Sequence, residues 1–393
     1  MSFRSHGQPA THAVASAGDA CALTLVPTVV WPPLQPCPWP PAAGHAAWRA
    51  DFRSAVLDVV GEFVAGQTAE LGVAGLGVAG DILTEFVSGG KCLRSTFMYL
   101  GWLCGAPPSG AALSAAASLE LLHAFALLQD DVMDDSDERR GLPAAHVQLA
   151  HWHGQRGLPG SARRFGESAA ILLGDLCLIW AERMLRESGV EPRRLQRAWP
   201  RYDVMRTELA VGQFADLAGD IRRLPSLEAV LDVARRKSGN YTVRRPLEIG
   251  ATLAGCDDQL VTQLGRYGTA VGEAFQLRDD VLGVFGSPAT TGKPNGSDLL
   301  ERKATSVAVS AFELADAPTR RELTALVHTE DLDEAALDRW RMLIVATGAL
   351  ERIEDMIAQR LASARKHLAD MAVDDSVREA LSDLAIACGE RAR

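Results

Sequence analysis

The chain has 393 residues, of which 47% are hydrophobic and 23% are charged, and its net charge at pH 7 is −10. This composition predicts a globular protein with a sizeable core, and the acidic balance excludes nucleic acid as the main partner, because that partner calls for a basic face. The seven cysteines form no CxxC pair and several lie in apolar sequence, which predicts reduced thiols in a cytoplasmic protein and excludes a zinc site or a disulfide framework.

The N-terminal region, residues 1–44, differs in composition from the rest of the chain. Residues 20–48 carry no charge but contain seven prolines, which exclude a membrane-spanning helix. The first residues lack the basic and then apolar pattern of a signal peptide. We expect a disordered, Pro-rich tail before one domain at 45–393; the alternative is that Trp31 and Trp39 pack onto that domain.

Apolar residues recur with helical spacing from Trp48 onward, and alternating β-branched runs are nearly absent. The segment from Ser109 to Asp135 is apolar almost all round, which predicts a buried helix. An all-α bundle with long central helices is therefore the expected fold. We expect helices at about 47–67, 109–135, 167–188, 194–220, 227–239, 241–254, 258–286, 303–314, 318–327, 333–346, 349–372 and 375–389.

The sequence DDVMDD, residues 130–135, is the first of two acidic clusters. Helical spacing predicts that Asp130, Asp131 and Asp134 share one face, because residues three and four apart are neighbours there. Carboxylates about 5 Å apart repel by roughly 3 kcal/mol per pair at an effective dielectric constant near 20. The cluster therefore predicts a cation, and Mg²⁺ or Ca²⁺ prefers carboxylate oxygen.

The second acidic cluster is the pair Asp279 and Asp280. Apolar sequence precedes both clusters, LELLHAFALLQ before the first and VGEAFQL before the second. Acidic residues at the ends of apolar helices predict a metal site at the mouth of an apolar pocket. A shared metal would bring the two clusters face to face, which favours one domain.

Lysine is rare in this chain, since only five of the 40 Lys and Arg residues are lysines. Four of the five stand in Gly-rich or polar segments: Lys91, Lys237, Lys293 and Lys303. A compact ammonium group at such positions indicates phosphate as its partner.

Together these segments resemble the trans-isoprenyl diphosphate synthases, or polyprenyl synthetases, over roughly residues 85–310. Six ordered motifs carry the resemblance: GGKCLR, DDVMD with RRG, GQFADL, KSGNY, FQLRDDVLG and TGKPNGSDLLERKAT. The chain is most like a bacterial geranylgeranyl diphosphate synthase, which implies a single-domain, isoprenoid-synthase-type helical bundle with a central apolar pocket. Two positions depart from the family pattern: Cys92 replaces a common arginine, and Gly283 replaces the last aspartate of the second acidic motif.

The resemblance implies a role for each matching side chain. Three Mg²⁺ ions would be held by Asp130, Asp131, Asp134, Asp279 and Asp280. The implied catalytic residues are Lys237, Asp130, Asp131, Asp134 and Asp279. The implied substrate-binding residues are Lys91, Arg94, His123, Arg139, Arg140, Gln213, Lys237, Ser238, Tyr241, Gln276, Lys293 and Lys303, with Asp216 and Asp298 beside them.

The reaction implied by the family is Mg²⁺-dependent transfer of an allylic group to isopentenyl diphosphate. The allylic diphosphate ionises, the cation is attacked by the double bond of isopentenyl diphosphate, and a proton is lost to the released diphosphate. Mg²⁺ and a ring of Lys and Arg would stabilise the departing diphosphate in a water-poor pocket. The resemblance also implies a homodimer.

Product length is expected to depend on the helix that carries the first acidic cluster. Phe125 and Ala126 precede Asp130 by five and four residues, or about 6–8 Å at 1.5 Å per residue. In the family a bulky residue at either place acts as a floor, and one aromatic followed by a small residue resembles the geranylgeranyl (C20) enzymes. The alternative products are farnesyl (C15) and longer chains, and the alternative role for Phe125 is ordinary core packing.

Two other functions stay open. A class I terpene cyclase carries an aspartate-rich helix on a similar scaffold but needs no isopentenyl diphosphate site, so Lys91, Arg94 and His123 favour the synthase. A non-catalytic partner subunit usually lacks an acidic motif, and this chain retains the first one in full.

Overall fold

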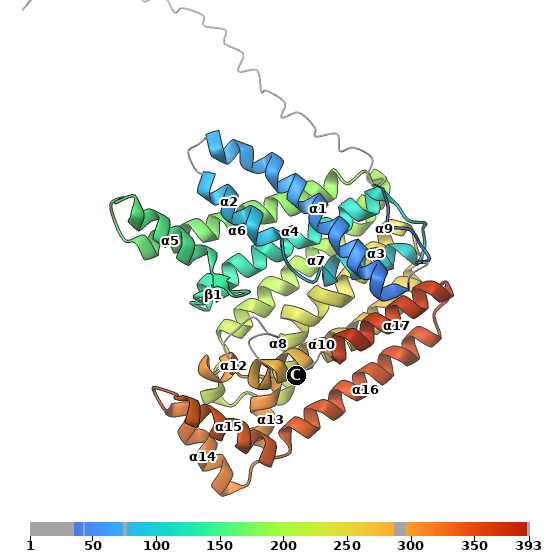
Figure 1. Ribbon diagram of the computed structural model, residues 1–393. Helices are drawn as coiled ribbons and strands as arrows, with labels where there is room; N and C mark the ends of the chain where they lie inside the picture. The colour runs from blue at the N-terminus through green and yellow to red at the C-terminus, as the bar shows by residue number, and fades with distance from the viewer. Residues whose placement is uncertain (1–34, 42–43, 74–76, 287–295, 391–393) are drawn as a thin grey trace, which may run out of the picture. The chain divides into compact units, whose positions relative to one another are not determined.

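Helices form nearly all of the described chain, as the periodicity predicts (Figure 1). The computed structural model describes residues 35–41, 44–73, 77–286 and 296–390. Most of the predicted N-terminal tail and the predicted substrate residue Lys293 lie outside the described residues. The chain from Leu34 to Arg393 forms one compact unit.

The described elements follow one another along the chain in this order. The first elements are α1 (His45–Val73), α2 (Gly77–Val87), α3 (Leu93–Leu103), α4 (Gly110–Met133), β1 (Glu138–Arg139), β2 (Leu142–Pro143), α5 (Ala145–Gln155), α6 (Ala162–Arg186) and α7 (Pro192–Leu217). They are followed by η1 (Ile221–Arg223), α8 (Leu227–Ala234), η2 (Arg235–Arg244), α9 (Arg245–Ala254) and α10 (Asp258–Phe285). The last described elements are α12 (Ser297–Leu300), α13 (Ser306–Leu314), α14 (Ala317–His328), α15 (Glu334–Ala346), α16 (Ala349–Ala369) and α17 (Asp375–Gly389).

Four described helices, α2, α3, α5 and the short α12, have no counterpart among the predicted ones. α3 is buried at nine of its eleven positions, so its sequence lacks the polar face that reveals a helix. The predicted helix at 303–314 is also different, because a short α12 precedes it and α13 begins only at Ser306. The other predicted helices lie close to the observed bounds.

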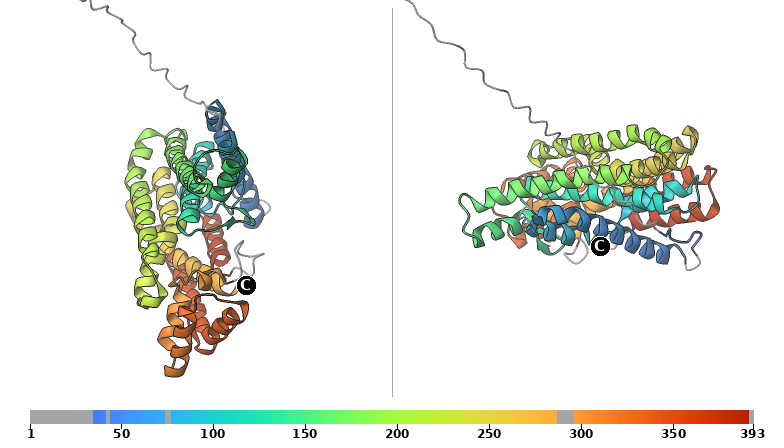
Figure 2. Two further views of the ribbon diagram at one scale, coloured as in Figure 1. Left: turned by 90° about the vertical axis from the view of Figure 1, so that its left-hand side faces the viewer. Right: turned by 90° about the horizontal axis from the view of Figure 1, so that it is seen from above.

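α4 is a buried core helix, as its apolar sequence predicts, and it packs along α6 (Figure 2). Among the described helices, α4 alone is long and apolar enough to cross a membrane by length and composition. However, 72% of its apolar window is buried inside the protein. That burial is what a core helix of a folded domain requires.

The first acidic cluster stands where α4 ends. The backbone N–H of Asp134 donates to the carbonyl of Asp130 at 2.8 Å, which closes the last turn. The next residue, Asp135, has a φ of 51°, and a left-handed residue at this place ends a helix. The acidic side chains therefore lie at the end of an apolar helix, where Asp130 and Asp134 are partly exposed and Asp131 is buried.

A small hairpin follows α4 and brings the RRG segment back to it. β1 pairs with β2 in antiparallel fashion, with Arg139 opposite Leu142. The two residues between the strands, Arg140 and Gly141, both have positive φ, which is the pattern of a type I′ turn. This turn places the two arginines at the acidic end of α4.

The predicted break at Asn240 is absent, because η2 is a π-helix that runs without interruption from α8 into α9. Gly239 serves close packing here, since a Cβ on Gly272 of α10 would lie 2.5 Å from the Gly239 carbonyl oxygen. On the other side, a Cβ on Gly212 of α7 would lie 2.5 Å from the backbone nitrogen of Lys237. Widened helical turns of this kind are frequent at functional sites.

The C-terminal helices support α10 from the side remote from α4. α10 packs along α16 and also contacts α13 and α17 (Figures 1 and 2). Near α17, where His45 Nδ1 lies 3.0 Å from Asp383, the ring of Trp39 meets that of Trp48 edge to face, with centroids 5.0 Å apart. Residues just before α1 therefore contact the helical unit.

Candidate active site

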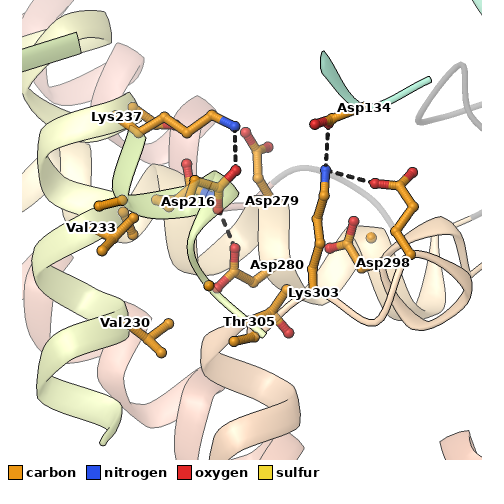
Figure 3. Close-up of a pocket in the computed structure, with 18 of the residues that line it drawn as sticks. Asp134, Asp216, Val230, Val233, Lys237, Asp279, Asp280, Asp298, Lys303 and Thr305 are labelled. Atoms are coloured by element: carbon orange, nitrogen blue, oxygen red, sulfur yellow. Dashed lines mark hydrogen bonds and ion pairs between the residues drawn. The ribbon is translucent and has the colours of Figure 1, made fainter. Parts of the chain in front are cut away.

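A cavity of about 740 Å³ lies among α7, α8, η2, α10 and α12 (Figure 3). Three of the five lysines of the chain line it: Lys91, Lys237 and Lys303. The acidic lining residues are Asp134, Asp216, Asp279, Asp280, Asp298 and Glu301. An apolar wall is supplied by Ala215, Leu217, Ala229, Val230, Val233 and Ala234. The cavity thus joins both acidic clusters to lysines on one side and to hydrocarbon on the other.

Lys237 connects the end of α4 to α7. Its Nζ lies 2.6 Å from Asp216 and 3.3 Å from Asp130 (Figure 3 shows the first of these). Gln213 donates to the same Asp130 at 3.0 Å. Burial alone would lower the pKa of Lys237, but the two carboxylates raise it above its usual value, so the ammonium is retained at neutral pH.

Lys303 makes the matching connection on the other side of the cavity. Its Nζ lies 2.8 Å from Asp134 and 2.7 Å from Glu301 (Figure 3). Burial would lower the pKa of Lys303, yet attraction to these two carboxylates raises it. Asp130 and Asp134, one turn apart on α4, therefore each bind a lysine from a distant part of the chain.

Asp131 is more deeply buried than Asp130, and both carboxylates contact the guanidinium of Arg139. The Asp131 side chain is 1% exposed and accepts two hydrogen bonds from the guanidinium of Arg139 on β1. Neither Asp130 nor Asp131 is among the described residues that line the cavity, whereas Asp134 is. Burial raises the pKa of Asp131, although Arg139 opposes that shift. The contacts of Asp131 are those of a residue that positions Arg139.

Asp280 on α10 is buried and is bound by neutral groups. Its Oδ2 accepts from the backbone N–H and the hydroxyl of Ser306 at 2.9 and 2.6 Å, and its Oδ1 accepts from Gln276 at 2.8 Å. Burial raises the pKa of Asp280, and these hydrogen bonds only partly offset it. Because Ser306 is the first residue of α13, Asp280 fixes the start of that helix. Asp279, its neighbour, lines the cavity.

A second group of predicted residues lies where GGKCLR approaches the hairpin turn. Arg140 lies directly against Gly89 and Gly90, since Cβ atoms there would meet its guanidinium nitrogens at 3.0 and 3.2 Å. Arg140 also donates to the carbonyl of Phe86 at 3.2 Å. Lys91, which directly follows Gly90, lines the cavity. The two glycines therefore bring a lysine and an arginine to one place.

His123 and Tyr241 extend this basic group toward α4 and η2. The guanidinium of Arg94 lies 4.3 Å from the centre of the Tyr241 ring, a cation–π distance, and the rings of His123 and Tyr241 are 6.4 Å apart. Burial, and then the charges of Arg94, Arg140 and Arg139, hold the pKa of His123 well below its usual value. The imidazole is therefore neutral at pH 7, and its buried Nδ1 has no protein partner.

The remaining predicted residues fall into two sets. Ser238 and Gln276 line the cavity with the lysines. Phe125 and Ala126 are half-buried on α4, and neither is among the described residues that line this cavity. Their role as a floor therefore stays a prediction.

The donor set fits Mg²⁺, although no three acidic, His or Cys side chains of the described residues are grouped closely enough to form a complete metal cage. The acidic donors around the cavity are all carboxylates, the hard oxygen ligands that Mg²⁺ prefers. Mg²⁺ is usually held by one or two carboxylates together with phosphate oxygens and waters. Separate carboxylates beside retained lysines suit an ion that binds along with a diphosphate.

Sequence reasoning missed several partners of these residues. Glu301 pairs with Lys303, Ser306 binds Asp280, and Arg53 donates to the carbonyl of Gly90 at 2.6 Å. Glu301 and Ser306 lie next to or near the recognised Lys303, so proximity to that motif was the available signal. Arg53 lies on α1, outside every motif, and no sequence signal marks it.

Comparison with known proteins agrees with this geometry. A sequence model of the polyprenyl synthetase family matches residues 78–343. A geranylfarnesyl diphosphate synthase of Aeropyrum pernix is 32% identical over 311 residues, 78% of this chain and 91% of the relative. A nonaprenyl diphosphate synthase of Mycobacterium tuberculosis is 30% identical over 328 residues, 83% of this chain and 91% of the relative.

A solved structure is similar over almost the same region. It is a geranylgeranyl pyrophosphate synthase of Corynebacterium glutamicum complexed with isoprenyl diphosphate and magnesium, and it is 37% identical with a TM-score of 0.81. The match covers 87% of this chain and 99% of the other. The family match includes both acidic clusters and all the lysines of the cavity. The chain belongs to the polyprenyl synthetase family of trans-prenyltransferases.

Proposed function

We propose that this enzyme condenses isopentenyl diphosphate with an allylic diphosphate, using Mg²⁺, to give linear geranylgeranyl diphosphate. The observation that carries the proposal is the meeting of both acidic clusters with three of the five lysines around one cavity with an apolar wall. Carboxylates suit Mg²⁺, lysines suit phosphate, and the apolar wall suits a prenyl chain.

Asp130 and Asp134 on α4 and Asp279 on α10 are the residues that would hold Mg²⁺. When bound, Mg²⁺ would neutralise the diphosphate and favour its departure. Lys237 and Lys303 already lie within 3.3 Å of Asp130 and 2.8 Å of Asp134, so each ammonium is positioned beside the same group. Because the pKa of both lysines is raised, their charges are available to the departing diphosphate at neutral pH.

The apolar wall serves the cationic stage of the reaction. Val230 and Val233 of α8 lie below Asp216 and Lys237, as Figure 3 shows. Hydrocarbon side chains supply no nucleophile and keep water away from an allylic cation. The released diphosphate accepts the proton lost from the condensed product, so no further side-chain base is required.

Isopentenyl diphosphate is assigned to the basic group around Lys91, Arg94 and Arg140. These cations are kept near one another by the Gly89–Gly90 turn and by the Tyr241 ring. A neutral His123 can donate one hydrogen bond to phosphate and adds no charge to an already basic group. The retained lysine and arginines support binding in spite of Cys92.

A C20 product is proposed because one aromatic residue, Phe125, is followed by the small Ala126 on α4, five and four residues before Asp130. The named relatives make products of different lengths, so family membership leaves the length open. On this proposal Ala126→Phe shortens the product and Phe125→Ala lengthens it. Gas chromatography of the dephosphorylated alcohols measures both, and unchanged lengths in both variants would refute the floor.

A product assay tests the reaction itself. The purified protein is given Mg²⁺, isopentenyl diphosphate and, in turn, dimethylallyl, geranyl or farnesyl diphosphate. A linear C20 alcohol after dephosphorylation is the expected product, whereas a C15 or longer alcohol would retain the chemistry and reject the length. A cyclic hydrocarbon made without isopentenyl diphosphate would identify a terpene cyclase, and no turnover would favour a partner subunit.

A homodimer is proposed from an exposed apolar surface on α6 and α7. Leu172 and Ile179 of α6 are 62% and 60% exposed, and Phe214 of α7 is 77% exposed. An ion pair of 3.0 Å between Glu182 and Arg206 joins these helices, so their exposed apolar side chains belong to adjacent elements. Apolar surface of this kind indicates an interface between copies of the chain.

Light scattering tests this interface. Leu172→Glu should reduce the measured mass from two chains to one chain of 42.1 kDa. The matched control is Met342→Glu on α15, which also replaces an exposed apolar residue. A dimer that persists in Leu172→Glu and Phe214→Glu would reject this surface.

The buried, free cysteines of the described residues support a reducing, cytoplasmic location.

A further inference from the structure

Arg302, in the turn that follows α12, has a backbone conformation that is unusual for a residue with a side chain. Its φ is 53°, in the left-handed region. Its N–H donates to the carbonyl of Leu299 at 3.1 Å, and the N–H of Lys303 donates to that of Asp298 at 2.9 Å. These two bonds form a Schellman motif, in which the left-handed position is usually a glycine. A residue with a Cβ persists in this conformation only where surrounding contacts hold it.

The side chain of Arg302 supplies those contacts by binding the C-terminal end of α14. Its guanidinium donates to the carbonyls of Val327 and Glu330 at 3.1 and 3.0 Å, and also to that of Thr329. α14 ends at His328, so these carbonyls lie in its last turn and just beyond it. Carbonyls at this end of a helix lack partners within the helix and carry partial negative charge. One arginine therefore joins the ends of α12 and α14.

The residue that this turn holds in place is Lys303, one of the lysines of the cavity. Its ammonium contacts Asp134 at 2.8 Å, as Figure 3 shows, and Glu301 at 2.7 Å. Lysine carries its charge on a flexible four-carbon stem, so the placement of the ammonium depends on where the backbone is held. Because Arg302 directly precedes Lys303, its contacts with α14 fix that backbone.

We propose that Arg302 is a positioning residue, which holds the Lys303 ammonium in place for the diphosphate by joining the turn after α12 to the end of α14. The inference rests on the proposed function, because it assigns Lys303 a diphosphate to bind. Arg302 also lines the cavity, so the alternative is that its own charge acts on the diphosphate. A positioning role requires that the effect of Arg302 depends on Lys303, whereas a direct role is independent of that lysine.

Three substitutions separate the contacts of Arg302 from its charge. Arg302→Gly removes the guanidinium and relaxes the left-handed backbone, and Arg302→Ala removes the guanidinium alone. Arg302→Lys keeps the charge but presents one nitrogen where the guanidinium uses two. The glycine variant should melt at a higher temperature than the alanine variant, because alanine retains a Cβ in the left-handed region.

Arg378→Ala is the matched control for the loss of such a contact. Arg378 of α17 donates to the carbonyls of Leu368 and Met371 at 2.6 and 3.0 Å, so it binds the C-terminal end of α16 as Arg302 binds that of α14. It is not among the described residues that line the cavity. Arg378→Ala should therefore lower the melting temperature and leave diphosphate binding unchanged.

The readout is calorimetric binding of inorganic diphosphate in the presence of Mg²⁺, which needs no turnover. Each of the three Arg302 variants should bind about 10-fold more weakly than the parent protein, the lower end of the range for residues that orient a binding group. In a Lys303→Gln background, Arg302→Gly should change the affinity by less than about twofold, because the side chain that Arg302 positions is gone. In a Lys237→Gln background the loss of about 10-fold should persist, since Arg302 does not hold that lysine.

The inference alone is overturned if the parent protein binds diphosphate and Lys303→Gln weakens binding, but Arg302→Gly and Arg302→Ala bind as the parent does. A full loss in the Lys303→Gln background, or parental binding in Arg302→Lys, would also overturn it, because either result assigns Arg302 a direct role through its charge. Weaker binding in Arg378→Ala would overturn it by showing that lost stability accounts for the effect.

Two further outcomes reach beyond Arg302. Unchanged affinity in Lys303→Gln would overturn both the role proposed for Lys303 and this inference. A parent protein that binds no diphosphate with Mg²⁺ would overturn the proposed function as well.

Discussion

At the end of α4, Asp130 and Asp134 each contact a lysine, whereas on α10 Asp280 is bound by Ser306 and Gln276. The first motif is thus surrounded by cations from η2, the hairpin and the turn after α12. The second motif has a buried carboxylate that fixes a helix start. Two acidic sequences that look alike are therefore held by different forces.

The difference separates the tasks of the two motifs. Lysines beside Asp130 and Asp134 offset the charge of those carboxylates, and on the proposed function they also present positive charge to a diphosphate. Hydrogen bonds to Asp280 add no charge, so that carboxylate mainly orders the structure around Asp279. We expect losses of charge at the first motif to affect both stability and turnover, and changes at Asp280 to affect chiefly stability.

Asp131→Ala should give the largest loss of stability. It removes one member of a buried ion pair and leaves the Arg139 charge without its partner, which costs about 3–5 kcal/mol of unfolding free energy. Urea unfolding without Mg²⁺ measures the loss. An equal loss of unfolding free energy in Asp280→Ala would contradict this difference between the motifs, because neutral hydrogen bonds would then stabilise the fold as much as the ion pair does.

Lys237→Gln should give the largest loss of turnover. Removing one preorganised donor from a site of developing negative charge costs about 10²- to 10³-fold in kcat, or about 2.7–4 kcal/mol. The matched control is Lys366→Gln, an exposed lysine on α16. A melting temperature close to that of the parent protein shows that the fold is intact. Equal turnover of the two variants would show that Lys237 has no role in the active site.

Asp280→Ala should cost less than Asp131→Ala, about 1–3 kcal/mol, because it leaves the Ser306 N–H buried without an acceptor. The cost should grow as the pH falls. The pKa of Asp280 is raised above its usual 3.8, so the folded state takes up its proton more readily than the unfolded state does. Wild-type stability relative to the variant therefore rises as the pH is lowered from 7 toward 4. Unfolding curves that give a constant difference would contradict the raised pKa.

The sequence predicted much of this architecture because its signals are local. Long apolar periods marked α4 and α10, and the rare lysines marked the segments that meet at the cavity. The break predicted at Asn240 was wrong, because η2 continues the helix from α8 into α9. Nothing near this position in the sequence reveals that Gly272 of α10 packs against the carbonyl oxygen of Gly239.

The orientation of Asp131 and the partner of Gly283 were beyond sequence reasoning for a similar reason. Helical spacing shows which residues are neighbours, but only the structure shows that Asp131 is buried against Arg139. The sequence shows that Gly283 replaces an aspartate of the family motif, but only the structure shows that the Asp298 carboxylate lies directly against this glycine. Contacts between segments decide which acidic residue faces the site.

The smallest expected effect concerns His123, and it has the opposite sign to that of Asp280. Burial and the arginines near the first motif keep the pKa of His123 well below 6.5, so the unfolded state binds the proton more readily. Wild-type stability should therefore fall as the pH drops below about 6.5, by at most about 1.4 kcal/mol per pH unit from this residue. His123→Gln removes that contribution, so unfolding free energies at pH 7.5 and 5.5 should differ less in the variant. Equal pH dependence in both proteins would mean that burial and the arginines do not hold His123 neutral. The electrostatic contrast between the basic group around His123 and the hydrogen-bonded surroundings of Asp280 would then be smaller than the structure indicates.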